Sequence, residues 1–360
     1  MDLIHSEQRI KNLLRVVAQQ GASDLHLVVG RHPTLRIDGK LTPLTQEKIL
    51  TGEDTKALTD ILIKSEKHKQ ELLKFGQTDF SYNFEDKARF RTNAYFQKGL
   101  ISVAMRLVLS KIRTLEELNV PTRLYDLCKL SQGLVLITGP VGHGKSTTLA
   151  AMIDYINRNS DRHIITIEDP IEYVFEQDRC IINQREVGQD ATSFHDALRA
   201  VFREDANVVM IGEMRDLDTI STAMTAAETG HLIFATLHTN DSSQTIDRII
   251  DVFPSYQQNQ IRTQAASVIS AVISQRLLPK IGGGRIPALE IMIKNHAVEN
   301  LIRENKTFQL DTVIETSMKE GMISLDKSLA ELVQKGMISV DDAYSYAKNR
   351  DYLHILMKKK

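Results

Sequence analysis

The chain has 360 residues, and at roughly 150 residues per domain this length predicts two domains, or one large and one small. Apolar residues make up 42% of the sequence, enough for real cores, while 45 basic and 46 acidic residues leave a net charge of −1. Because the charge is balanced, composition gives no support to proteins that bind nucleic acid or anionic membranes.

The first hundred or so residues predict a small α+β domain. Apolar residues at near-helical spacing predict a helix over residues 3–19, and a second helical region is expected over 45–75. Alternating apolar residues bounded by turn residues predict strands in DLHLVVG, HPTLRIDGKLTPL, TDFSYNF and ARFRTNAYFQKGLISVAMRLV. We expect this domain to span 1–107, followed by a linker over 108–120 that contains a proline.

From residue 121 to 360 the pattern predicts a second domain of the α/β class. Four nearly continuous apolar runs predict parallel strands buried on both faces: LVLITG, HIITIED, NVVMIGE and HLIFATLH. They alternate with helical stretches such as TSFHDALRAVFRED, which favours a doubly wound sheet. After residue 255 we expect mainly helices, from QQNQIRTQAASVISAVISQRLL to DDAYSYAKNRDYLHILM.

The stretch LVLITGPVGHGKSTTLAAM has the layout of a phosphate-binding loop. It satisfies G-x-x-x-x-G-K-[ST] between a predicted strand and a predicted helix, which is the context that this motif requires. The glycines let backbone N–H groups point into one concavity, Lys145 reaches the β- and γ-phosphates, and the Ser146 hydroxyl can ligate Mg²⁺. We therefore expect ATP and Mg²⁺ as cofactors, with a nucleotide-binding set of Gly139, Gly142, Gly144, Lys145, Ser146 and Thr147.

Acidic residues follow two of the predicted strands. VVMIGEMRD places Glu213 at the carboxyl end of its strand, where a carboxylate can activate an attacking water or hold Mg²⁺ through water. IITIEDPIEY delivers Glu168, Asp169 and Glu172 from another strand. A single acid at a strand end can also cap a helix or lie on the surface, and for Asp169 both interpretations stay open.

Histidines and arginines complete the set of candidates. GHLIFATLHTND puts His231 and His238 at opposite ends of a predicted strand, and His238, at the carboxyl end, is the better placed to sense a γ-phosphate. A lone histidine is otherwise most often structural. Hydrolysis also needs an added cation, and the candidate arginine fingers are Arg89, Arg91, Arg106 and Arg113, each of which could instead lie on a solvated strand face.

Cysteine use and the N-terminus bear on the compartment. Cys128 and Cys180 lack the paired spacing of a zinc or redox motif, which fits a reducing interior. The start MDLIHSEQRIKNLLRVV is not a signal peptide, and no run approaches the roughly 18 to 20 apolar residues that span a bilayer. We expect a cytoplasmic protein that something else holds at any membrane where it works.

These motifs, in this order, resemble the secretion-superfamily ATPases, and most closely the type IV pilus retraction ATPases, the PilT family. GASDLHLVVGRHPTLRIDGKL resembles the start of the family's PAS-like domain, GPVGHGKSTTLAAM its Walker A and TIEDPIEY its Asp box. GEMRDLDTISTAMTAAETGHLIFATLHTN resembles Walker B running into the His box, and this long match is very specific.

The resemblance implies a RecA-like ATPase domain preceded by a PAS-like domain, a homohexameric ring, and ATP hydrolysis that drives pilus retraction and twitching motility. It implies docking on an inner-membrane platform protein of the pilus machine, at the inner face of the membrane. The balanced charge and the lack of tryptophan predict no nucleic-acid partner. The matching positions are Glu213 as the catalytic glutamate, Glu172 and Glu168 as Asp-box acids near Mg²⁺ and water, His231 and His238 as the His-box pair, and Arg91, Arg106 and Arg113 as arginines that reach the phosphates.

Two departures from the family pattern stand out. Val141 and His143 replace the Thr and Ser usual inside the phosphate loop, which leaves the backbone donors intact but can change turnover or pH response. AVENLIREN, at 297–305, resembles the family's retraction motif, but Glu299 replaces its first arginine. The second departure weakens the retraction assignment more than the ATPase assignment.

Three alternatives stay open. An assembly or export ATPase of the same superfamily usually carries a further N-terminal domain and a paired-cysteine zinc subdomain, and neither pattern is seen here. A RecA-like nucleic-acid motor would be expected to show a basic groove with aromatic stacking positions, whereas the sequence has no tryptophan and balanced charge. A nucleotide-gated module with a dead motor is disfavoured by Lys145, Ser146 and Glu213 together.

Overall fold

The protein is described from a computed structural model that covers residues 3–37, 39–84, 88–108 and 112–358. The chain divides into two compact units, Met1–Lys111 with Pro170–Val174, and Ile112–Asp169 with Phe175–Lys360. Part of the expected linker, 109–111, lies outside the described residues.

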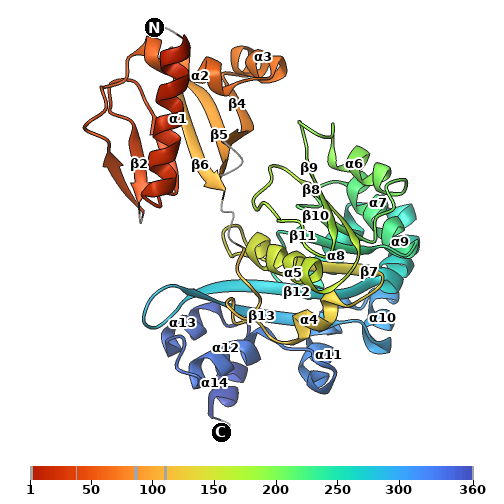
Figure 1. Cartoon of the computed structure of the whole chain (residues 1–360). Coiled ribbons are helices and arrows are strands. Elements are labelled where there is room, and N and C mark those ends of the chain that lie inside the picture. The colour runs from red at the N-terminus through yellow and green to blue at the C-terminus, as the bar shows by residue number, and fades with distance from the viewer. Residues whose placement is uncertain (1–2, 38, 85–87, 109–111, 359–360) are drawn as a thin grey trace. The chain divides into compact units, whose positions relative to one another are not determined.

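The first unit is built on a six-stranded antiparallel sheet with strand order β3-β2-β1-β6-β5-β4, counted over the described residues. Its elements are α1 (Leu3–Gln19), β1 (Asp24–Leu27), β2 (Thr34–Ile37), β3 (Lys40–Pro43), α2 (Gly52–Leu62), α3 (Glu66–Phe75), β4 (Gln77–Phe84), β5 (Ala88–Gln97) and β6 (Leu100–Val108). Helix α1 buries Ile10, Leu13 and Val17, spaced at helical intervals, in a core that it shares with α2 and the sheet (Figure 1).

The expected helical region over 45–75 proves to be two helices that begin later. Helix α2 starts at Gly52 because Thr51 and Asp54 form a capping box, in which each side chain accepts the other's backbone N–H. Residues 45–51 precede this cap and are not helical. Helix α3 ends at Gly76, whose φ of 75° gives a left-handed cap.

The second unit contains a seven-stranded sheet, within the described residues, in the order β13-β12-β7-β11-β10-β8-β9. Its strands are β7 (Gly133–Thr138), β8 (His163–Glu168), β9 (Ile181–Glu186), β10 (Val208–Ile211), β11 (Leu232–Leu237), β12 (Ile269–Pro279) and β13 (Arg285–Ile293). All neighbouring pairs are parallel except β12 with β13. Every residue of β7 and β11 is buried, as expected for strands covered on both faces.

Helices cover both faces of this sheet. Helix α5 (Lys145–Asn159) contacts β7 and β11 from one side and also packs against α4 (Arg123–Cys128). On the other face, a hydrophobic core joins the sheet to α6 (Phe194–Val201), α7 (Leu217–Glu228), α8 (Ser242–Asp251) and α9 (Ser255–Val268). Figure 1 shows these helices beside the sheet. The doubly wound α/β arrangement expected for this domain is confirmed.

The expectation of mainly helical structure after residue 255 is wrong for 269–293. The segment ISAVISQRLLP is strand β12, which forms an antiparallel hairpin with β13. Its β-branched Val272 and Ile273 are fully buried and favour a pleated surface, so tertiary packing overrides the helical spacing read from the sequence.

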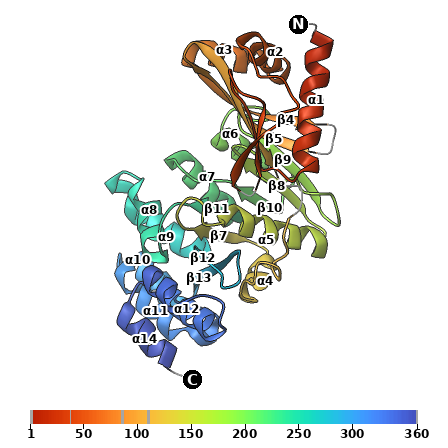
Figure 2. The same ribbon diagram turned by 90° about the vertical axis from the view of Figure 1, so that its left-hand side faces the viewer.

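Helices follow the hairpin to the end of the described chain. They are α10 (His296–Arg303), α11 (Leu310–Thr316), α12 (Leu325–Gln334), α13 (Val340–Tyr346) and α14 (Arg350–Lys358), with short 3₁₀ turns at Thr307–Gln309 and Met318–Glu320. Helices α12 and α14 pack on each other beside the hairpin (Figure 2). Among the described residues, no helix is both long enough and apolar enough to cross a bilayer.

Candidate ATPase site

The phosphate loop joins the end of β7 to the start of α5. Gly139, Gly142 and Gly144 have φ values of 138°, 80° and 78°, backbone conformations that residues with a Cβ atom rarely adopt. Gly144 is the cap residue before Lys145, so the first backbone N–H groups of α5 point out of the helix into the loop. Ser146 and Thr147 lie in this first turn, half-buried, where a hydroxyl can face a bound phosphate or cation.

Lys145 starts a chain of polar contacts at the carboxyl ends of the strands. Its buried ammonium donates to the carbonyls of Gly139, at 2.8 Å, and Pro140, at 3.0 Å, and lies 3.2 Å from Nδ1 of His238. An ammonium can only donate, so Nδ1 accepts and the proton of the neutral ring is on Nε2. Nε2 then donates to Oε1 of Glu213 at 3.0 Å. One imidazole thus links the loop lysine to the strand-end carboxylate.

Glu213 is held as a carboxylate. Its second oxygen, Oε2, accepts from Nη2 of Arg215 at 2.7 Å. Burial alone would raise the pKa of Glu213, but Arg215 and His238 outweigh it and hold the pKa below its ordinary value. The ionised form is therefore present at neutral pH, and it can accept hydrogen bonds from a water or from a hydrated cation.

Glu168 lies at the end of β8, close to the residue before Glu213. It is 5% exposed, and its Oε1 accepts from the Thr166 hydroxyl at 2.7 Å and from the Gln184 amide at 3.1 Å. A Cβ added at Gly212 would contact Glu168. The structure therefore brings Glu168 next to the Glu213 segment, in a fixed orientation. Glu172 belongs to Pro170–Val174, which groups with the first unit.

The two candidate histidines lie at opposite ends of β11. His238 is in the polar chain described above, whereas His231 precedes the strand and its Nδ1 lies 3.0 Å from the carbonyl of Ala226. A strand of this length separates them by roughly 20 Å. Within this chain the structure does not bring His231 to the phosphate loop.

Arg91 and Arg106, candidate arginines of the first unit, lie on one pair of neighbouring strands. Arg91 on β5 is the register partner of Arg106 on β6, and both are exposed. Nε of Arg106 donates to Oδ1 of Asp24 at 2.8 Å, which fixes the guanidinium end of a long side chain. Arg113 is exposed at the start of the second unit.

Sequence reasoning missed Gln275, which supports the loop from β12. Its Nε2 donates to the carbonyl of His143 at 2.8 Å, and its Oε1 accepts from the Thr148 hydroxyl at 2.8 Å. A Cβ added at Gly139 would collide with the backbone carbonyl of Gln275. The signal in the sequence was the polar stretch Ser274, Gln275 and Arg276, which separates the apolar residues at 271–273 from those at 277–278.

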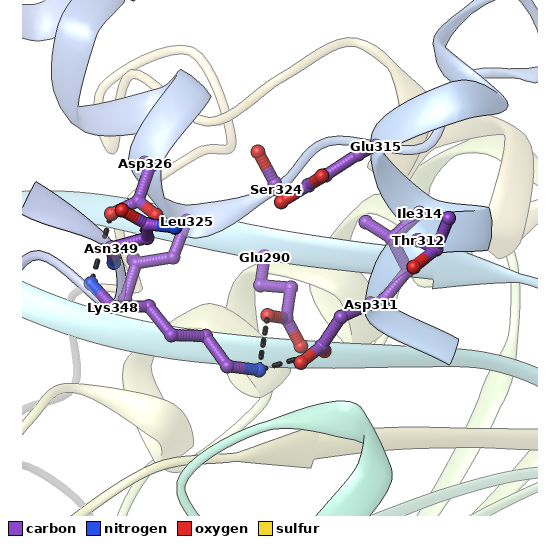
Figure 3. Close-up of a pocket in the computed structure, with 10 residues that line it drawn as sticks. All are labelled: Glu290, Asp311, Thr312, Ile314, Glu315, Ser324, Leu325, Asp326, Lys348 and Asn349. Carbon is purple, nitrogen blue, oxygen red and sulfur yellow. Dashed lines mark hydrogen bonds and ion pairs between the residues drawn. The ribbon is translucent and has the colours of Figure 1, made fainter. Parts of the chain in front are cut away.

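A pocket of about 310 Å³ lies elsewhere in the second unit (Figure 3). Lys348 enters it, with Nζ 2.7 Å from Oδ1 of Asp311 and 3.9 Å from Oε2 of Glu290. Asp326 accepts the backbone N–H groups of Lys348 and Asn349. These contacts join the segment between α13 and α14 to α11, α12 and β13.

The sequence profile of the family described as Type II/IV secretion system protein matches residues 2–283. The chain belongs to this family. It is 46% identical over 339 residues to the type IV pilus retraction ATPase PilT of Pseudomonas aeruginosa, covering 94% of this chain and 98% of that protein. It is 41% identical over 345 residues to the twitching motility protein of Neisseria gonorrhoeae, covering 95% and 91%.

A crystal structure of the pilus retraction motor PilT with bound ADP superposes on this family member with a TM-score of 0.89. The two share 45% identity, and the match covers 96% of this chain and 99% of the other. The resemblance to the retraction ATPases and the fold class expected from sequence are confirmed. The prediction that the chain is a P-loop ATPase is confirmed as well.

Proposed function

We propose that this chain is an ATP-hydrolysing motor that retracts type IV pili, and that its catalytic centre is the contact chain from Lys145 through His238 to Glu213. The single observation that carries the site assignment is this bridge, with one imidazole nitrogen 3.2 Å from the lysine and the other 3.0 Å from the carboxylate. It joins the group that would hold the phosphates to the group that would activate water.

Within the proposed site each side chain has a distinct task. Lys145 and the N–H groups of the loop hold the β- and γ-phosphates, and the ionised Glu213 orients and polarises the attacking water. His238 holds that carboxylate at a fixed distance from Lys145. If Lys145 moved to bind a phosphate, its contact with His238 would change, and His238 could pass this change on to Glu213. Glu168, fixed by Thr166 and Gln184, supplies a further acceptor beside Glu213.

Mg²⁺ would be held by a hydroxyl of the phosphate loop and, through water, by carboxylates. Among the described residues, no cluster of three or more acidic, histidine or cysteine side chains could hold a metal alone. Ser146 in the first turn of α5 is the protein's direct ligand in our proposal, with Glu172 or Glu213 acting through water. The bound cation would neutralise charge that develops on the phosphates.

The assembly is also part of the proposal. By resemblance to its family, we place the motor in a homohexamer, in the cytoplasm, docked on an inner-membrane platform protein of the pilus machine. Arg91, Arg106 and Arg113 are the proposed source of cations that complete the site, and His231 acts from a neighbouring subunit if it is catalytic. Closure around ATP would then couple hydrolysis to movement. We assign the domains as 1–107, 108–120 and 121–360.

The test combines enzyme kinetics with pilus counts. Glu213→Gln should keep ATP bound but lower kcat by at least about 100-fold, because a positioned base contributes that much. Lys145→Ala should lose both binding and turnover. Glu53→Gln, an exposed change on α2, is the control and should match the wild type.

Source cells carrying Glu213→Gln should show abundant surface pili, by electron microscopy, that no longer shorten. Bald cells would move the assignment to pilus assembly, and an unchanged count would point to another cargo. Near-normal turnover of the purified Glu213→Gln protein would contradict the catalytic role itself.

A further inference from the structure

Strand β12 loses its neighbour where the phosphate loop begins. Strand β7 pairs with β12 as far as Thr138 opposite Ser274, and then turns away into the loop. Strand β12 continues to Pro279, paired by β13 on its other edge only. Backbone groups on the edge that β7 has left need new partners, because unpaired buried N–H groups are costly.

His143, one residue before the cap of α5, supplies one of these partners. Its ring atom Nδ1 accepts the backbone N–H of Leu277 at 3.0 Å. Its own carbonyl accepts from the side chain of Gln275 at 2.8 Å. The loop is therefore tied to β12 twice at a single residue, once through its side chain and once through its backbone.

The imidazole is in the form that can accept. Burial lowers the pKa of His143, and Arg276, Lys145 and Arg285 lower it further. Tyr346, at the end of α13, also packs beside the imidazole, with 6.2 Å between the ring centroids. The three cations favour the neutral ring, and because the Leu277 N–H donates to Nδ1, the proton of that neutral ring is on Nε2.

We propose that His143 is a positioning residue that holds the phosphate loop in its nucleotide-binding conformation by accepting the Leu277 N–H. The residues on either side of it, Gly142 and Gly144, both have positive φ, so the backbone itself does little to select this conformation. A loop fixed before the phosphates arrive pays less ordering entropy on binding. The inference rests on the proposed nucleotide site and adds a residue to it.

Two variants separate the acceptor from the rest of the side chain. His143→Asn places Oδ1 near the position of Nδ1 and keeps an acceptor, whereas His143→Leu keeps the bulk and loses it. We expect His143→Leu to raise KM for ATP and Kd for a fluorescent ADP analogue about tenfold, the effect of one lost hydrogen bond to a partly buried group. The value of kcat at saturating ATP should stay within about twofold of wild type, because Glu213 is untouched.

Rescue decides the interpretation. His143→Asn should bring KM and Kd back to within about threefold of wild type, and His296→Leu, at a fully exposed histidine, should change neither. Melting curves establish that each variant is folded. Equal KM values in wild type and His143→Leu, equal defects in the Leu and Asn variants, or a loss confined to kcat would each overturn the proposal. Absence of nucleotide binding by the wild-type protein would instead overturn the proposed function, and this inference with it.

Discussion

Lys348 is the cation that balances three acids where the C-terminal helices meet the sheet, and its removal should destabilise the second unit. Its Nζ lies 2.7 Å from Asp311, 3.5 Å from Asp241 and 3.9 Å from Glu290. Burial raises the pKa of Glu290, and Lys348 opposes this shift. Lys348→Met keeps most of the side-chain volume but removes the ammonium from all three carboxylates, and Arg276 is then the cation whose charge still acts on Glu290 and Asp241.

The size of the stability loss follows from how exposed the side chains of Lys348 and Glu290 are. Removing one partner of a fully buried ion pair costs about 3–5 kcal/mol, and an exposed pair is worth about 0–1 kcal/mol. The Lys348 side chain is 35% exposed and that of Glu290 only 4%, so we expect an intermediate loss. A loss of about 2 kcal/mol would lower the melting temperature of a unit of this size by roughly 4–8 °C.

The loss should depend on pH. In the wild type, burial already holds the folded pKa of Glu290 above its unfolded value, and loss of Lys348, which opposes this shift, should raise it further. The contribution of Glu290 to stability is complete below the unfolded pKa and falls as pH rises through the folded pKa. The difference between variant and wild type should therefore be smaller near pH 5 than near pH 8, in melting curves followed by circular dichroism. Lys335→Met, at an exposed position on the same helical region, is the control. A Lys348→Met protein that melts with this control at both pH values would refute the reasoning.

Two further predictions concern the loop and a buried thiol. Gly139→Ala puts a methyl group against the Gln275 carbonyl at a φ of 138°, so we expect at least a tenfold loss of nucleotide affinity by fluorescence titration. Gly282→Ala, at a position with positive φ but open space, is the control and should bind nucleotide normally. Equal affinities of the two variants would contradict the collision. Burial raises the pKa of Cys128 to about 12. Alkylation of Cys128 at pH 8, followed by mass spectrometry, should therefore be at least 100-fold slower in the native protein than in urea, and rapid labelling of the native protein would contradict this burial.

Sequence alone predicted the residues whose place follows from a strand end. Lys145, Glu213 and His238 each follow a buried apolar run, and the carboxyl ends of parallel strands meet at one edge, so their convergence was predictable. The motif order also carried the family resemblance.

The supports of the loop were not predictable in the same way. Gln275 reaches the loop from 132 residues away, because β12 lies next to β7 in the sheet, and the apolar spacing of its segment suggested a helix. The hydrogen bond between His143 and Leu277 depends on the point where β7 turns away, a register that the sequence does not encode locally. His231 was grouped with His238 by motif, although strand length separates them.

The hairpin of β12 and β13 belongs to two hydrophobic cores at once. Its inner residues, such as Val272 and Met292, lie in the core beneath the sheet, and its outer residues, such as Leu278 and Ile286, pack with α12 and α14. The hairpin is therefore packed at both of its ends, and between them Gln275 of β12 contacts the phosphate loop. Because the same hairpin contacts the C-terminal helices and, through Gln275, the phosphate loop, a displacement of those helices would be transmitted to the loop through β12. A force applied to the C-terminal helices and the geometry of the phosphate loop would thus depend on the same two strands.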